Sequence, residues 1–130
     1  MKKVFLLATA VVFSLVAMAQ PKPDEVAKFN EEKHNFGKLK QNVPVTFFFE
    51  IKNISQQPLV VENSWASCGC TTPDKISDPI MPGTTAKLKV VFTAGQPSAF
   101  LKDVYVKFAG IDQPKTLQIT GEVLSPEAYD

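Results

Sequence analysis

The most reactive side chains in this sequence belong to two cysteines that stand one residue apart, Cys68 and Cys70, with Gly69 between them. The chain contains no other cysteine, so a disulfide within one chain can join only these two residues. A bridge between residues i and i+2 closes a very small loop and contributes little chain-entropy stabilisation. The pair therefore cannot staple distant segments of a fold together.

Three kinds of chemistry fit the pair. In an extended strand, residues i and i+2 point to the same face about 6.6 Å apart, and Gly69 lets the backbone bend enough to close a local, redox-labile disulfide. Two thiolates also suit a soft metal ion such as copper(I), for which His34 and Met81 are the further ligands on offer. Alternatively, two small apolar side chains can pack beneath Trp65 at a sheet corner.

The remaining polar residues do not form a catalytic pattern. His34 has no serine or cysteine partner in a known catalytic arrangement, and Lys75, the nearest cation to the cysteines in the sequence, gives only weak support for a lowered thiol pKa. Four carboxylates are scattered in loop-like segments: Glu31, Glu32, Asp74 and Asp78. The sequence predicts no catalytic residues, no cofactor and no resident metal, so we expect a protein that is not an enzyme.

Short strands must position the cysteines, because apolar and polar residues alternate along most of the chain. In VTFFFEIKN, Phe47 and Phe49 fall on one face, whereas Phe48 and Glu50 fall on the other. Alternation of this kind covers residues 45–53, 58–65, 84–92, 101–108 and 115–123, and turns rich in proline and glycine separate these runs. The predicted core contains Phe47, Phe49, Leu88, Val90, Val106 and Ile119.

The strand spacing predicts an all-β fold, a seven-stranded antiparallel immunoglobulin-like sandwich. One of the seven strands is an irregular edge strand within KFNEEKHNFGKL, with Gly37 in a turn. The bridge of antibody domains needs two cysteines far apart beside a buried tryptophan, and this spacing is missing here. Apolar faces alone must hold the sandwich, and we expect Phe48 and Tyr105 to share an apolar patch on its outside.

The N-terminus predicts a secretory signal peptide. Lys2 and Lys3 precede an uncharged apolar run of about 15 residues, and Ala17-Met18-Ala19 gives a small-x-small cleavage pattern before Gln20. This run is shorter than the ~20 residues that a spanning helix needs, so we expect cleavage and no membrane insertion afterwards. The expected parts are a signal peptide at 1–19, a flexible tether at 20–28, one domain at 29–124 and a C-terminal tail at 125–130.

The charged residues argue against two classes of partner. The chain has 14 lysines and no arginine against 13 acidic residues, and removal of Lys2 and Lys3 leaves 12 lysines. Arginine is the favoured side chain for phosphate recognition, so a nearly neutral chain without it is not expected to bind nucleic acid or an anionic membrane surface.

The motifs HNFGKL, FEIKN, SCGCT, PIMPG and LQITGEV, in this order, resemble the domain-of-unknown-function 1573 (DUF1573) family of short exported bacterial proteins. The resemblance covers residues 29–124 and is most specific at SCGCT. It implies an immunoglobulin-like sandwich related to Hydin-like (ASH) and major-sperm-protein domains, which mostly serve as binding or scaffold modules.

Taken with the signal peptide, this resemblance gives the expected function. We expect a non-enzymatic binding or structural module in the periplasm or on the cell surface of a Gram-negative bacterium, with another envelope protein as its partner. The alternative is a thiol-based redox or copper(I)-handling protein that uses Cys68 and Cys70.

Overall fold

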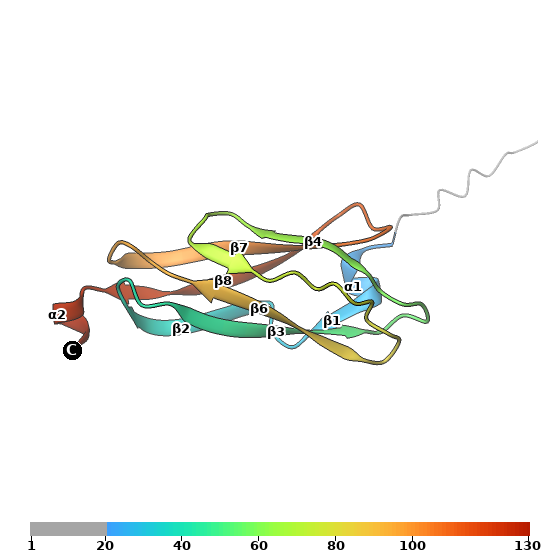
Figure 1. The fold of residues 1–130 in the computed structure, drawn as a ribbon, viewed down its shortest axis with the longest axis horizontal. Coiled ribbons are helices and arrows are strands. Elements are labelled where there is room, and N and C mark those ends of the chain that lie inside the picture. Colours follow the sequence, from blue (N-terminus) through green and yellow to red (C-terminus); the bar gives the residue numbers. More distant parts are fainter. Residues whose placement is uncertain (1–20) are drawn as a thin grey trace, which may run out of the picture.

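The computed structural model describes residues 21–130, so the predicted signal peptide at 1–19 lies outside the described residues. The chain forms an elongated sandwich of two sheets (Figure 1). A helical turn, α1 (Pro23–Val26), lies near one end, and a second, α2 (Pro126–Tyr129), lies at the opposite end with the C-terminus. Within residues 21–130, no helix is long and apolar enough to cross a membrane.

Each sheet has four strands. The first, called sheet A here, has the order β1 (Ala27–Phe29), β3 (Val45–Asn53), β6 (Thr85–Phe92) and β5 (Thr71–Pro73). The second, sheet B, has the order β2 (Lys33–Lys40), β8 (Lys115–Leu124), β7 (Ser98–Phe108) and β4 (Val61–Ala66). Strands β1 and β2 therefore lie at one edge of the sandwich, and β4 and β5 lie at the other.

The sandwich is confirmed, but it has eight strands rather than the predicted seven. The predicted edge strand is broken at residues 30–32, where the chain leaves β1 in sheet A and enters β2 in sheet B. Because β2 then runs in the same direction as β8, this pair is parallel, and the prediction of a wholly antiparallel sandwich was wrong. Helix α1 and the start of β1 also occupy part of residues 20–28, the predicted tether.

The predicted core is confirmed at five of its six positions. Phe49, Leu88, Val90, Val106 and Ile119 are all 0% exposed between the sheets. Phe47 is only partly buried, because β1 pairs with β3 at residues 51–53 and leaves the rest of this edge uncovered. The ring of His34 stacks on Phe47 with 3.6 Å between the ring centroids, so this histidine helps to cover the edge.

A bulge in β4 overturns the predicted position of Trp65. The pairing of β4 with β7 shifts register between Val61 and Asn63, which moves the following residues to the opposite face. Trp65 is therefore 38% exposed and stacks on Tyr105 outside sheet B, instead of lying above the cysteines. Phe48 is exposed on sheet A, so the predicted patch of Phe48 with Tyr105 does not form.

A second bulge, in β2, shapes one end of the sandwich. Gly37 has a left-handed φ of 74° at this bulge, and its carbonyl approaches β8. A Cβ atom on Gly121 would stand 2.8 Å from that carbonyl oxygen and 2.9 Å from the ring of Phe100. Gly121 therefore gives space to Phe100, which stacks on the buried Phe92 with ring centroids 4.2 Å apart.

Candidate functional site

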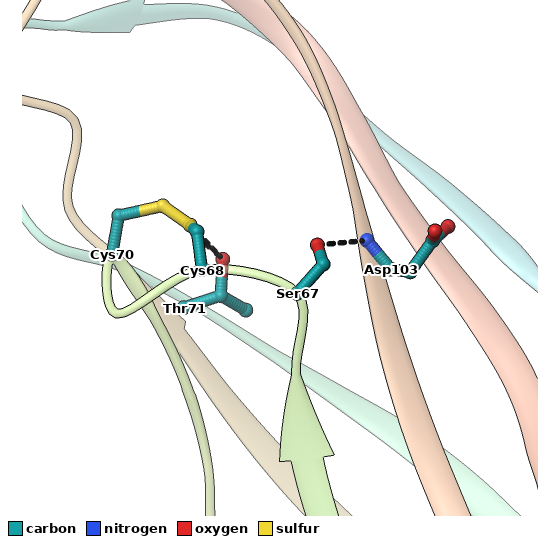
Figure 2. Close-up of a disulfide and its surroundings, with 5 residues drawn as sticks. All are labelled: Ser67, Cys68, Cys70, Thr71 and Asp103. Carbon is teal, nitrogen blue, oxygen red and sulfur yellow. Dashed lines mark hydrogen bonds between the residues drawn. A yellow bond between two sulfur atoms is a disulfide. The ribbon is translucent and has the colours of Figure 1, made fainter.

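The two cysteines lie in the link that carries the chain from β4 in sheet B to β5 in sheet A. A disulfide joins Cys68 to Cys70 at the tip of this link, with 5.4 Å between the two Cα atoms (Figure 2). The Cα separation is shorter than the ~6.6 Å of an extended strand, so the backbone bends as the bridge requires. The structure thus contains the local disulfide, one of the three alternatives for this pair.

Gly69 is not required by the geometry of the bridge. Its φ lies outside the left-handed region, and a Cβ atom placed on it would meet nothing within 4 Å. A residue with a side chain can therefore adopt the same conformation at this exposed position.

Backbone hydrogen bonds fix both sides of the link independently of the disulfide. The Ser67 N–H donates to the Asp103 carbonyl at 2.9 Å. The Asp103 N–H in turn donates to the Ser67 hydroxyl at 3.1 Å (Figure 2). On the other side, the Thr93 N–H donates to the Cys70 carbonyl at 3.0 Å. The link is thus tied to sheet B through Ser67 and to the end of β6 in sheet A through Cys70.

Thr71 places a hydroxyl group beside both sulfur atoms. Its Oγ1 lies 3.8 Å from the Cys68 Sγ and 3.7 Å from the Cys70 Sγ. Thr71 is buried at 4% exposure in the first position of β5. The hydroxyl can therefore donate a hydrogen bond to either sulfur when the bridge opens and that sulfur becomes a thiolate.

Cys70 also lines a cavity of about 410 Å³ at this end of the sandwich. The stacked rings of Phe92 and Phe100, together with Val123, form an apolar part of its wall. The turn between β6 and β7 supplies polar groups, including Gln96. The cavity is thus an amphipathic recess with one residue of the disulfide, Cys70, in its lining.

Apart from the bridged Cys70, Lys102 is the one residue with an ionisable side chain that lines this cavity among residues 21–130. It occupies the register of β7 that points between the sheets, two residues before the buried Val104. The sequence suggested Lys75 as the nearest cation, but the cation that shares the cavity with Cys70 comes from a strand more than 30 residues further along the chain. Sequence proximity alone could not identify it.

The additional ligands of the soft-metal alternative lie elsewhere. Met81 precedes β6 and Cys70 lies beside the end of this strand, which places them roughly 20 Å apart at the usual rise per residue. His34 lies at the opposite edge, where its Nδ1 is 2.8 Å from the Glu31 Oε2. No group of three histidine, cysteine, aspartate or glutamate side chains suited to a metal ion occurs in the described part of the chain.

A family described as "Protein of unknown function (DUF1573)" matches residues 27–123 of this sequence. The match runs from the first residue of β1 to the penultimate residue of β8, and it includes both cysteines and Lys102. A comparison with curated protein sequences finds no match.

Solved structures share the fold at low sequence identity. The VesB protease of Vibrio cholerae is 15% identical with a TM-score of 0.59, over 78% of this chain and 33% of VesB. The ASH/PapD-like domain 7 of human CEP192 is 12% identical with a TM-score of 0.57, over 88% of this chain and 96% of that domain. The SrpA adhesin of Streptococcus sanguinis is 12% identical with a TM-score of 0.59, over 88% of this chain and 62% of the adhesin. The expected relation to ASH domains is confirmed, and at these identities the likeness shows the fold alone.

Proposed function

The chain belongs to the DUF1573 family, and from that premise we propose that it is a non-enzymatic binding module of the bacterial cell envelope that docks onto an acidic surface of another envelope protein. The ASH/PapD-like and adhesin neighbours support a binding or structural role. This chain matches only a third of VesB, which gives no reason to transfer the protease activity.

The observation that carries this proposal is a group of lysines on the outer surface of sheet A, which we call the lysine face. It consists of the exposed ring of Phe48 and four exposed lysines on the same face: Lys28, Lys52, Lys87 and Lys89. Phe48 stands opposite Lys89 in the pairing of β3 with β6, and its side chain is 47% exposed. The face thus combines positive charge with an accessible apolar group.

The lysine face lowers the stability of the isolated protein. Lys28 and Lys52 stand directly opposite each other in the pairing of β1 with β3, and like charges in that position destabilise a sheet. Within residues 21–130, no acidic side chain forms an ion pair with any of the four lysines, although Glu50 stands opposite Lys87. An acidic partner would relieve this repulsion and be attracted by the same charges.

The test compares charge reversal on the two outer faces. The double variant Lys87→Glu, Lys89→Glu changes the lysine face, and the matched control Lys33→Glu, Lys38→Glu changes two exposed lysines of β2 on sheet B. The partner is first captured by crosslinking the tagged protein in cells and is identified by mass spectrometry. Its affinity for the purified variants is then measured at low and high salt.

We expect the lysine-face variant to bind the partner at least about tenfold more weakly, and the wild-type affinity to fall with salt. The control variant should retain affinity within about twofold. Equal affinity of the two variants would show that the partner binds elsewhere.

Export is part of the same proposal, and the signal-peptide pattern before Gln20 supports it. We expect intact-mass spectrometry of the protein from the envelope fraction to find a chain that begins at Gln20. A chain that retains Met1 in that fraction would instead indicate an N-terminal anchor.

A further inference from the structure

The disulfide and the cavity beside it carry an inference that goes beyond the proposed binding function. We infer that the cavity binds a cysteine-containing peptide with an apolar residue next to its cysteine, and that Cys70 forms a mixed disulfide with this peptide. Three properties of the site support the inference: the disulfide is not needed to hold its own link, Cys70 lines a recess, and the recess is chemically suited to such a peptide.

The first property is that the bridge can open without releasing the two ends of the link. Ser67 and Cys70 are hydrogen-bonded to different sheets, and neither hydrogen bond involves sulfur. Reduction of the bridge therefore leaves the ends of the link in place, and the two thiols stay close enough to close it again. A disulfide that opens and closes in this way is suited to exchange.

The second property is that the two sulfur atoms differ in their surroundings. Both cysteines are half-buried, but Cys70 contributes to the wall of the 410 Å³ cavity and Cys68 does not. A thiol that enters the cavity therefore meets the Cys70 side of the bridge. The geometry points to Cys70 as the sulfur that is attacked.

The third property is the chemistry of the lining. The rings of Phe92 and Phe100 offer apolar contact to a side chain next to the attacking cysteine, while the ammonium group of Lys102 attracts the thiolate. No carboxylate lines the cavity among the described residues. The combination favours a thiolate with an apolar neighbour over a strongly acidic or purely polar thiol.

The exchange balances without an additional oxidant. The peptide thiolate attacks the Cys70 Sγ, a new S–S bond forms between peptide and Cys70, and the Cys68–Cys70 bond breaks. The electron pair of the broken bond stays on the Cys68 Sγ, which becomes a thiolate beside the Thr71 hydroxyl. Attack by this thiolate on the mixed disulfide reverses the step and releases the peptide.

The experiment uses single serine variants of the exported chain, because each leaves one free thiol and no second thiol to reverse the reaction. Cys68→Ser leaves Cys70, and Cys70→Ser leaves Cys68 as the matched control. Each variant is mixed with the symmetrical disulfide of N-acetyl-Phe-Cys-amide, of N-acetyl-Ser-Cys-amide or of glutathione. The free thiol displaces one half of the probe as a thiolate and keeps the other half, so intact mass measures the rate.

We expect the Cys70 thiol to react with the phenylalanine probe about tenfold faster than the Cys68 thiol does, because burial of an aromatic ring readily supplies the ~1.4 kcal/mol that a factor of ten represents. The serine probe and glutathione should not show this preference. Equal rates for the two thiols, or equal rates with all three probes, would overturn the inference. A preference for glutathione would show that the cavity binds a small acidic thiol rather than the peptide, and it would equally contradict the inference.

The role of Lys102 is tested in the Cys68→Ser background. Lys102→Gln should slow the reaction of Cys70 roughly threefold. Loss of the cation should raise the pKa of the Cys70 thiol, and a rise of one unit lowers the thiolate fraction about tenfold. The more basic thiolate is also more nucleophilic, which offsets part of this loss. Lys102→Arg should restore the rate because it keeps the positive charge. Lys107→Gln changes a lysine of the same strand whose ammonium pairs with Glu62, and it should have no effect. A Lys102→Gln variant that melts at the wild-type temperature and reacts at the unchanged rate would contradict the role of Lys102.

Discussion

A short link connects the two sheets at each edge of the sandwich, and the two links are held in different ways. Residues 30–32 join β1 to β2 at one edge, and residues 67–70 join β4 to β5 at the other. Backbone hydrogen bonds tie each link to both sheets: Asn30 to Glu50 and Glu32 to Gln118 in the first link, and Ser67 to Asp103 and Cys70 to Thr93 in the second. The difference lies in the additional interaction that each link has.

Beside the first link, Lys115 forms ion pairs that connect distant parts of the sequence. The Lys115 ammonium pairs with Asp24 at 2.6 Å and also with Glu32, and it lies 5.5 Å from the centre of the Phe29 ring. These carboxylates are 91 and 83 residues away from Lys115 in the sequence. The second link has a covalent bond, but that bond spans only two residues. The non-covalent contacts beside the first link therefore connect distant parts of the fold, whereas the disulfide constrains only its own loop.

The largest expected effect comes from the core that lies beneath both links. Phe49→Ala should lower the free energy of unfolding by about 3–5 kcal/mol, because Phe49 is 0% exposed and its removal leaves a cavity. Urea unfolding followed by circular dichroism measures the loss. A loss below about 1 kcal/mol would mean that Phe49 is not tightly packed between the sheets. The core would then provide no reference for the smaller stability effects expected of the two links.

The next largest effect belongs to the link at residues 30–32. Lys115→Gln should cost about 2 kcal/mol, since it removes two ion pairs with exposed carboxylates and a cation–π contact. Lys40→Gln is the matched control, because within residues 21–130 the Lys40 ammonium pairs only with the exposed Asp130, at 3.3 Å. This variant should cost less than about 0.5 kcal/mol. Equal losses in the two variants would show that Lys115 contributes no more to stability than Lys40 does.

The same ion pairs predict a pH dependence. Burial alone would lower the pKa of Lys115, but the hydrogen bonds and charges of Asp24 and Glu32 outweigh it and raise the pKa above its ordinary value of 10.5. A raised lysine pKa contributes stability that is fully present below the unfolded-state value and is lost as the pH rises through the folded-state value. The stability difference between wild type and Lys115→Gln should therefore shrink as the pH rises above about 10.5, the ordinary value for lysine. A constant difference over this range would contradict the ionic origin of the effect.

Much of the fold could be predicted from the sequence because alternation reports directly on burial. Phe49, Leu88 and Ile119 lie where the period of two places them, in the core. The alternation failed where the backbone departs from a regular strand. The bulge in β4 turns Trp65 to the outer face, and strict alternation cannot predict this because a bulge adds one residue to the strand.

The candidate site was only partly accessible to sequence reasoning. Cys68 and Cys70 were identified because their spacing is unusual, but Lys102 was missed because it approaches the site through the packing of the sheets. Asn53 is fully buried, and its side-chain amide donates to the carbonyls of Gln57 and Ile80. A hydrogen-bonded asparagine of this kind cannot be told from an exposed one by its neighbours in the sequence.

The smallest expected effect, and the most direct test of the comparison, is the contribution of the disulfide to stability. The measurement is the free energy of unfolding of the wild-type chain in urea, with the Cys68–Cys70 bridge intact and after its reduction. The Cys68→Ser, Cys70→Ser double variant, measured in parallel, controls for effects of the reductant. We predict that reduction costs about 1 kcal/mol and no more than about 1.5 kcal/mol, the chain-entropy limit for so small a loop. A loss of about 3 kcal/mol or more, typical of a structural disulfide, would contradict this prediction and show that the disulfide stabilises the whole fold.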